Sequence, residues 1–201
     1  MLKVGLTGGI ASGKSTVAAI LRELDIMVLE MDPLGHELLE LGQDAYDEVV
    51  REFGAEIIGP QTEINRAKLG AIVFADAAKR ARLNQILHPR ILDVVLKWFS
   101  ALDHPGGPDF AVVEAALIIE SGFHKRLDNL IVCLSTPEQQ IQRLVERGLT
   151  AEQAQLRITS QMPSDEKRNY ADEVIDCSRS LEETELQVKA VVAHLTQLAA
   201  F

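Results

Sequence analysis

Short apolar runs alternate along the chain with longer stretches in which apolar residues recur every three to four positions. The apolar runs predict strands, and the stretches between them predict helices. Strands that alternate with helices are typical of a parallel sheet with helical crossovers. The sequence therefore predicts an α/β fold with a core of about five parallel strands flanked by helices. The predicted strands are residues 2–6, 27–30, 110–114, 129–134 and 173–176.

Three helices are marked by their first residues. Residues 136–139 combine a capping threonine, a proline in the first turn and a glutamine three residues after the cap. Residues 150–153 and 180–183 follow the same S/T-x-x-E/Q pattern, in which two side chains satisfy backbone N–H groups at the helix start. The pattern predicts helices that begin directly after Thr136, Thr150 and Ser180.

The segment between the second and third predicted strands is longer than one crossover helix requires. We interpret residues 33–109 as a helical insertion that holds a substrate, and residues 148–167 as a second insertion that forms a lid. Residues 1–32, 110–147 and 168–201 then form the core of a single domain. Within the first insertion the periodicity predicts helices at 33–41, 44–53, 66–74, 76–87 and 89–102, followed by a loop at 104–108.

Composition narrows the class of protein. The chain has 201 residues, 47% of them hydrophobic and 25% charged, which suits one globular domain. Its net charge of −10 argues against nonspecific nucleic-acid binding, which needs a broad cationic surface. No apolar run is long enough to cross a membrane, and no signal-peptide pattern is present. Cys133 and Cys177 form neither a disulfide framework nor a zinc spacing, so we expect a cytoplasmic protein.

Residues 8–15 match the G-x-x-x-x-G-K-[ST] pattern between an apolar run and a helical run. Glycines let backbone N–H groups turn toward phosphate oxygens, and the helix amino terminus adds partial positive charge. Lys14 is expected to reach the β- and γ-phosphates of ATP, and the Ser15 hydroxyl to bind Mg²⁺. The pattern predicts a P-loop NTPase-type core, although a glycine-rich turn that only joins a strand to a helix is an alternative. The expected nucleotide-binding residues are Gly9, Ile10, Ala11, Ser12, Gly13, Lys14, Ser15 and Thr16.

Other P-loop classes fit less well than a small-molecule kinase. Residues 103–106 match the D-x-x-G of GTPases, but they lie in a predicted loop before a strand, and the sequence has no N-K-x-D for guanine. A motor or transporter ATPase would need a longer chain. Glu114, at the end of the third predicted strand, could serve as an outer-shell partner of Mg²⁺.

Two carboxylates follow the second predicted strand. Glu30 and Asp32 are two residues apart, so both could face a cleft at the carboxyl end of what we expect to be an inner strand. A carboxylate there could accept the proton of an attacking hydroxyl, as the base of a kinase does. The alternative is that residues 32–33 only cap the next helix.

Basic residues follow the fourth predicted strand. Arg143 and Arg147 are four residues apart and share a helix face, where they could clamp phosphates or stack on adenine. A solvated charged face is the alternative. The lid contributes further polar side chains that could close over the phosphates and exclude water, namely those of Arg157, Gln161, Lys167 and Arg168.

Several motifs occur in a fixed order along the chain. Residues 6–16 read L-T-G-G-I-A-S-G-K-S-T, and residues 28–32 read V-L-E-M-D. Further motifs lie at residues 65–70, 86–89, 117–120, 140–143, 147, 161–163 and 171–176. In order and spacing these motifs resemble those of the dephospho-CoA kinase family, over nearly the whole chain.

The resemblance implies transfer of a phosphoryl group from ATP to dephospho-CoA with Mg²⁺, in an enzyme with a core, a helical CoA-binding region and a lid. It implies a catalytic base at Asp32, with Lys14 and Arg143 stabilising the transferred phosphoryl group and Arg147 contacting the nucleotide. The substrate-binding residues that it implies are Thr7, Glu30, Asp32, His36, Arg66, His88 and Leu117.

Four positions depart from the family pattern. Glu30 stands where aspartate is usual, and His36 replaces a frequent arginine, which makes the local charge depend on pH. Ala116 replaces a proline, and Gly148 stands where aspartate or asparagine is common. Lys14, Ser15 and Asp32 are unaffected.

Two alternatives to this function remain. One is another small-molecule kinase, for a nucleoside or nucleoside monophosphate, and the other is a nucleotide-dependent regulatory protein. His88, next to Pro89, either contacts the substrate or caps a helix. We expect a monomer or a small homo-oligomer, without nucleic-acid or membrane partners.

Overall fold

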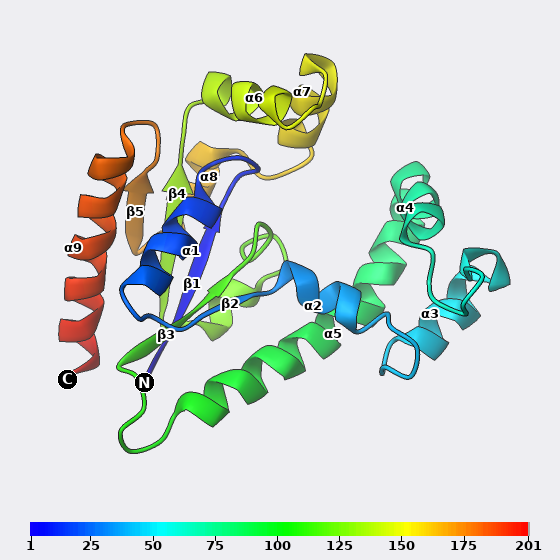
Figure 1. The fold of residues 1–201 in the computed structure, drawn as a ribbon, viewed down its shortest axis with the longest axis horizontal. Coiled ribbons are helices and arrows are strands. Elements are labelled where there is room, and N and C mark those ends of the chain that lie inside the picture. Colours follow the sequence, from blue (N-terminus) through cyan, green and yellow to red (C-terminus); the bar gives the residue numbers. More distant parts are fainter. Residues whose placement is uncertain (201) are drawn as a thin grey trace. The chain divides into compact units, whose positions relative to one another are not determined.

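Five strands pair into one sheet in the order β2-β3-β1-β4-β5 (Figure 1). The computed structural model describes residues 1–200. The pairs β1–β3, β1–β4 and β4–β5 are parallel, with Leu6 opposite Glu114 on one side and Ile131 on the other. Because β1 is central, its last residue lies at the carboxyl edge of the sheet, where parallel sheets bind ligands. The strands are β1 (Leu2–Gly8), β2 (Val28–Glu30), β3 (Phe110–Glu114), β4 (Asn129–Leu134) and β5 (Glu173–Asp176).

All five predicted strands are confirmed, with β1 extended to Gly8 and β2 beginning at Val28. The expectation of an inner position for β2 is wrong, because β2 is an edge strand of this sheet. The strand also ends at Glu30, and Asp32 is the first residue of α2 (Asp32–Glu37). The N-cap of α2 is Met31, without a side-chain hydrogen bond from the described residues, so the interpretation of Asp32 as the cap is wrong as well.

The chain falls into two compact units, which we call the sheet unit and the helical unit. The sheet unit comprises Met1–Leu29 and the chain from Phe99 onward, and the helical unit comprises Glu30–Trp98. Each unit has its own hydrophobic core. A fully buried side chain of Val, Leu, Ile or Phe contributes about 1.5 to 3 kcal/mol, so each core stabilises its unit substantially.

One core of the sheet unit joins two helices to the sheet. The helices are α1 (Lys14–Glu23) and α9 (Leu181–Ala199). Their apolar residues pack on alternate residues of the strands, as the two-residue period of a strand requires. Buried members of this core are Val4, Leu6, Val17, Leu21, Ile131, Cys133, Ile175, Val188 and Leu195.

The loop that follows β3 packs against β1 at Gly5, where the absence of a side chain leaves room for side chains of the loop. A Cβ atom at Gly5 would lie 2.5 Å from Leu127 Cδ1 and 3.5 Å from Ile118 Cδ1. Ile118 and Phe123 are buried, and the loop includes the short helix η2 (Phe123–Arg126). The segment just after β3 is therefore fixed close to the central strand.

Three further helices of the sheet unit follow β4, namely α6 (Pro137–Glu146), α7 (Ala151–Thr159) and α8 (Ser164–Arg168). All three predicted capping boxes are confirmed, with side chains of Thr136, Thr150 and Ser180 each accepting from the N3 amide. These boxes define where α6, α7 and α9 begin. No helix within residues 1–200 combines the length and apolar character needed to span a membrane.

The helical unit contains three α-helices, most of a fourth and one short 3₁₀ helix. They are α2, α3 (Tyr46–Phe53), η1 (Ala55–Ile57), α4 (Arg66–Ala75) and α5 (Ala77–Leu102). Its core is built from Tyr46, Val49, Phe53, Ile57, Leu69 and Ile86, with neighbouring apolar residues. Predicted helices are confirmed here, but α2 ends at Glu37 rather than at residue 41.

The two helices predicted on either side of residue 88 form one helix, α5, of 26 residues with Pro89 inside it. A proline lacks the N–H that a helix interior needs and usually breaks or kinks the helix. Here the guanidinium of Arg90 donates to the Ile86 carbonyl at 2.7 Å and to Glu48 at 2.8 Å. A side chain thus supplies a donor beside the proline. His88 lies inside this helix, so the prediction that it caps a helix is wrong.

Candidate active site

The loop between β1 and α1 turns sharply at residues 8–13. Gly13 is the N-cap of α1 with φ 105°, and Ala11 has φ 58°. The Ser12 amide donates to the Gly9 carbonyl at 3.2 Å, and the Thr16 amide donates to the Gly13 carbonyl at 3.0 Å. The left-handed conformation at Gly13 is the one for which glycine is suited. The local sequence therefore produces a closed turn at the carboxyl edge of the central strand.

This turn has the properties of an anion site. Among residues 1–200 no side chain caps α1, and its first turn contains no acidic residue. The Ser15 and Thr16 side chains are exposed at the helix start. The buried Ser12 hydroxyl has no hydrogen-bond partner in the described protein. Open amides, the helix dipole and free hydroxyls together suit a polyphosphate. The residues of this loop therefore fit the phosphates of ATP.

The Lys14 side chain folds back over the loop. Its Nζ atom donates to the carbonyls of Gly8 at 3.2 Å and Gly9 at 3.3 Å. Both bonds are long for N–H···O contacts, so exchanging them for a phosphate oxygen costs little. The Lys14 ammonium group, predicted to bind phosphate, thus already lies against the phosphate loop.

Two glutamines fix the Ile10 peptide at the tip of the loop. Its N–H donates to Gln161 Oε1 at 2.8 Å, and its carbonyl accepts from Gln140 Nε2 at 2.8 Å. Nearby, Ala11 packs in an apolar cluster with Leu144 of α6 and Ala154 of α7. The tip is therefore held by polar and apolar contacts to the helices after β4.

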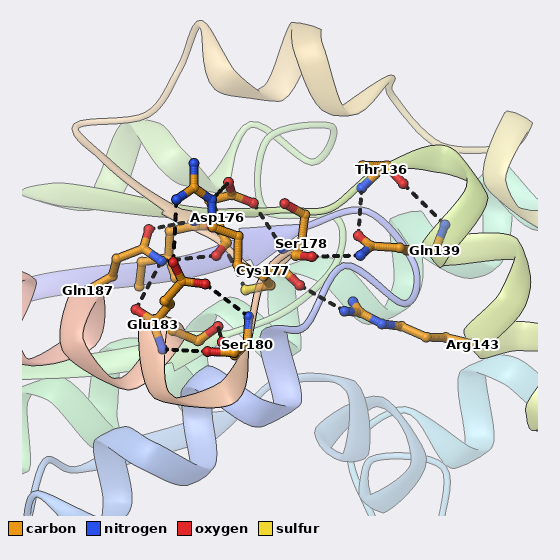
Figure 2. Close-up of polar contacts among 12 residues, drawn as sticks. Thr136, Gln139, Arg143, Asp176, Cys177, Ser178, Ser180, Glu183 and Gln187 are labelled. Atoms are coloured by element: carbon orange, nitrogen blue, oxygen red, sulfur yellow. Dashed lines mark hydrogen bonds and ion pairs between the residues drawn. The ribbon is translucent and has the colours of Figure 1, made fainter.

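Arg143 joins the phosphate loop to the segment after β5. Its Nη1 atom donates to the Ala11 carbonyl at 3.0 Å. Its Nη2 atom donates to the Cys177 carbonyl at 2.8 Å (Figure 2). A parallel contact runs from Gln139 Nε2 to the Ser178 carbonyl at 2.7 Å. In this structure Arg143 braces the loop, with its charge close to the turn. Arg147 is the C-cap of α6 and its side chain is exposed.

A pair of thiols lies behind the phosphate loop. Burial raises the pKa of Cys133, whereas a hydrogen bond from the Cys133 thiol and the charge of Arg143 lower the pKa of Cys177. Both cysteines are free and buried. Cys177 is consequently the thiol of the pair that loses its proton more easily.

One prediction about the lid is wrong. Lys167 was expected among the side chains that close over the phosphates, but its side chain is completely buried in a contact with Glu120. Arg157 and Arg168 are exposed, in agreement with polar surface positions. Physically, Lys167 could not be recognised as buried because its partner lies 47 residues away in sequence.

The implied substrate residues divide between the two units. Thr7 and Leu117 belong to the sheet unit, where the buried Thr7 hydroxyl donates to the Ala116 carbonyl at 3.3 Å and Leu117 is exposed. The remaining ones belong to the helical unit, where their side chains are exposed. Those residues are Glu30, Asp32, His36, Arg66 and His88. Burial of part of the His88 ring lowers its pKa.

Several residues that shape the site were not recognised from the sequence. Gln140 lies three residues before Arg143, and this i, i+3 spacing on one helix face could have indicated a shared role. Glu120 belongs to the motif at residues 117–120, but no role was predicted for it, and Cys177 reaches the site through the fold alone. The phosphate loop, Lys14 and Arg143, in contrast, are brought together as predicted.

The parallel sheet, the phosphate loop after its central strand and the helices that hold the loop define a P-loop kinase. The dephospho-CoA kinase family model matches residues 2–183. The chain belongs to the dephospho-CoA kinase family.

Similar proteins agree with this assignment. A dephospho-CoA kinase of Geobacillus kaustophilus is 42% identical over 192 residues, which cover 95% of each chain. A crystal structure from Thermus thermophilus matches with a TM-score of 0.83 and 33% identity, over 96% of this chain and 97% of the other. The dephospho-CoA kinase structure from Campylobacter jejuni matches with a TM-score of 0.73 and 26% identity, over 97% of each.

Proposed function

We propose that this protein transfers the γ-phosphoryl group of ATP to the ribose 3′-hydroxyl of dephospho-CoA, giving coenzyme A and ADP, the last step of coenzyme A synthesis. The observation that carries the proposal is the family match over residues 2–183 together with a complete phosphate loop. Two free cysteines support a cytoplasmic location, since reduced thiols are typical there. We propose a monomer or a small homo-oligomer without nucleic-acid or membrane partners.

ATP is proposed to bind with its phosphates over residues 9–16. The amides at the start of α1 and the Lys14 ammonium would hold the β- and γ-phosphates, and Lys14 would exchange its bonds to Gly8 and Gly9 for phosphate oxygens. Arg143 would add positive charge beside the loop, and Arg147 would contact the nucleotide from the end of α6. These groups stabilise the negative charge that spreads over the transferred phosphoryl group.

Mg²⁺ is proposed to bind at Ser15 and the phosphate oxygens. Within residues 1–200 no cluster of three or more His, Cys, Asp or Glu side chains is arranged to hold a metal ion. A hydroxyl, phosphates and water fit the habit of Mg²⁺ to keep most of its ligands outside the protein. When bound, the ion neutralises charge on the phosphate oxygens.

The residues proposed to bind the acceptor are Thr7, Glu30, Asp32, His36, Arg66, His88 and Leu117. Asp32 would accept the proton of the 3′-hydroxyl as the O–H bond breaks. The oxygen then forms a bond to the γ-phosphorus, and ADP leaves. What supports Asp32 is its position two residues after the end of β2, at the start of α2, and its match to the family motif.

The change Asp32→Asn tests the base directly. An amide keeps the size of the side chain but cannot take the proton, so kcat should fall by about 10²- to 10⁴-fold. The Kd for MgATP should change little. Turnover is measured as conversion of dephospho-CoA to coenzyme A, identified by mass, and ATP binding is measured by calorimetry.

A matched control is Asp93→Asn. Asp93 is an exposed carboxylate on α5 that pairs with Lys97 at 2.7 Å, so its loss should leave kcat unchanged. Comparable turnover in Asp32→Asn and the control would remove Asp32 as the base. Absence of coenzyme A with the unmodified protein would remove the proposed reaction.

A further inference from the structure

A lysine is buried at the base of the segment that holds the tip of the phosphate loop. Lys167 lies in α8 with 0% of its side chain exposed, and it is the only Lys or Arg that is buried among residues 1–200. Removing an ammonium group from water costs several kcal/mol unless it is paired and hydrogen-bonded. Its partners therefore define what this position requires.

The Lys167 ammonium has two acceptor groups, both in the loop after β3. Its Nζ atom lies 2.7 Å from the Ala116 carbonyl, and 2.8 Å and 3.1 Å from the two carboxylate oxygens of Glu120. Glu120 also accepts from the Met162 amide at 3.2 Å. One carboxylate thus holds both ends of residues 162–167.

These contacts continue to the phosphate loop on both sides. Gln161, next to Met162 in the chain, accepts from the Ile10 amide at 2.8 Å. The Ala116 carbonyl also accepts from the Thr7 hydroxyl at 3.3 Å, and Thr7 precedes the loop in β1. Lys167 and Glu120 therefore close a ring of contacts that begins and ends at the phosphate loop.

The charge of Lys14, in the phosphate loop, acts on this ring. Burial lowers the pKa of Lys167, Glu120 opposes this effect, and the charge of Lys14 lowers the pKa further. The effect of Lys14 indicates that the two ammonium groups lie within electrostatic range. Without Lys167, the Glu120 carboxylate would be an unpaired negative charge close to the site of the phosphates.

We propose that the ion pair of Lys167 and Glu120 is a positioning device that holds Gln161 on the Ile10 amide and thereby sets the affinity of the phosphate loop for MgATP. Lys167 and Glu120 act through Gln161 and Ile10 and do not touch the reacting atoms. Any effect of this ion pair on turnover rests on the proposed ATP-dependent reaction. Its effect on the loop does not depend on the acceptor.

The test follows the Ile10 amide by hydrogen exchange and MgATP binding by calorimetry. In Lys167→Met, the Ile10 amide should exchange faster, and the Kd for MgATP should rise by about tenfold or more. Gln161→Ala should accelerate exchange at the same amide. Lys167→Arg, which keeps charge and donors, should recover part of both properties.

A second set of variants separates positioning from charge. Lys167→Met combined with Glu120→Gln removes the unpaired carboxylate, so the double variant should bind MgATP more tightly than Lys167→Met alone. Lys189→Met is the matched control, since Lys189 forms an exposed pair with Glu185 at 2.6 Å and is 51% exposed. It should change neither measurement.

The inference is overturned if folded Lys167→Met melts at a lower temperature but keeps both the exchange rate of Ile10 and the Kd for MgATP. Should Lys167→Met not fold, Glu120→Gln and Lys167→Arg give the same two readouts. A protein that fails to phosphorylate dephospho-CoA, but whose Ile10 amide and MgATP affinity respond to Lys167→Met, would refute the proposed function and support this inference.

Discussion

Gly13 meets two separate demands at the start of α1. Its φ of 105° is a conformation that residues with a side chain adopt only with strain. In addition, a Cβ atom there would lie 2.6 Å from Cys177 Cβ and 2.8 Å from Cys177 Sγ. The phosphate loop is thus pressed directly against the segment after β5.

The change Gly13→Ala is expected to lower both stability and nucleotide affinity. Backbone strain alone costs about 1 to 3 kcal/mol, and the contact with Cys177 adds to it because the Cys177 Cβ atom is fixed by the backbone and cannot rotate away. Urea denaturation gives the free energy of unfolding, and calorimetry gives the Kd for MgATP.

Gly148→Ala is the matched control for this substitution. Gly148 has φ 93°, and a Cβ atom there meets nothing within 4 Å among the described residues. It should show the cost of strain without the contact and leave MgATP binding intact. Equal losses of stability in the two variants would show that contact with Cys177 does not constrain the loop.

The glycine pattern predicted the phosphate loop because the loop is a local structure, closed by bonds between neighbours. The proximity of Cys177 could not be predicted, since it depends on the pairing of β4 with β5. Lys167 was misinterpreted for the same reason. A lysine in a polar segment usually lies in solvent, and only the fold places Glu120 beside it.

At the scale of elements, the capping box of α6 fixes the start of the helix that carries Gln139, Gln140 and Arg143. The Thr136 hydroxyl accepts from the Gln139 amide at 3.3 Å, and Gln139 Oε1 accepts from the Thr136 amide at 3.2 Å. The same Gln139 side chain reaches the Ser178 carbonyl. The cap therefore connects the helix start to the segment after β5 (Figure 2).

Thr136→Ala should lower the free energy of unfolding by about 1 kcal/mol, the usual value of a lost N-cap. Thr159→Ala is the control, because it removes the same atoms as Thr136→Ala. The Thr159 hydroxyl bonds only to carbonyls of its own helix, α7. Its effect should stay within about 0.5 kcal/mol. Both values come from urea denaturation, and a loss in Thr159→Ala that matches the loss in Thr136→Ala would contradict the role of the cap.

Elements with strong local signals and their parallel arrangement were predicted well, but the position of β2 within the sheet was not. Apolar runs and capping boxes gave the strands and the starts of three helices, because hydrophobic period and cap chemistry act over a few residues. The break expected at Pro89 is absent, because α5 continues through the proline from Ala77 to Leu102. The position of β2 at the sheet edge is set by strand order, on which periodicity carries no information.

For the whole molecule, the two units divide the residues of the proposed reaction. The sheet unit contains the phosphate loop, Lys14 and the contacts that hold Ile10. The helical unit contains Asp32 and most residues proposed to bind the acceptor. The family match extends across both units, over residues 2–183.

The most direct test of the proposed phosphoryl transfer is ADP release from MgATP with dephospho-CoA, compared with adenosine, AMP and no acceptor. We predict ADP with dephospho-CoA only, in an amount equal to the coenzyme A formed. Preference for adenosine or AMP would contradict the proposed substrate and retain the P-loop kinase. ADP release that does not depend on an acceptor, or no release by folded protein that binds ATP, would contradict the proposed phosphoryl transfer itself.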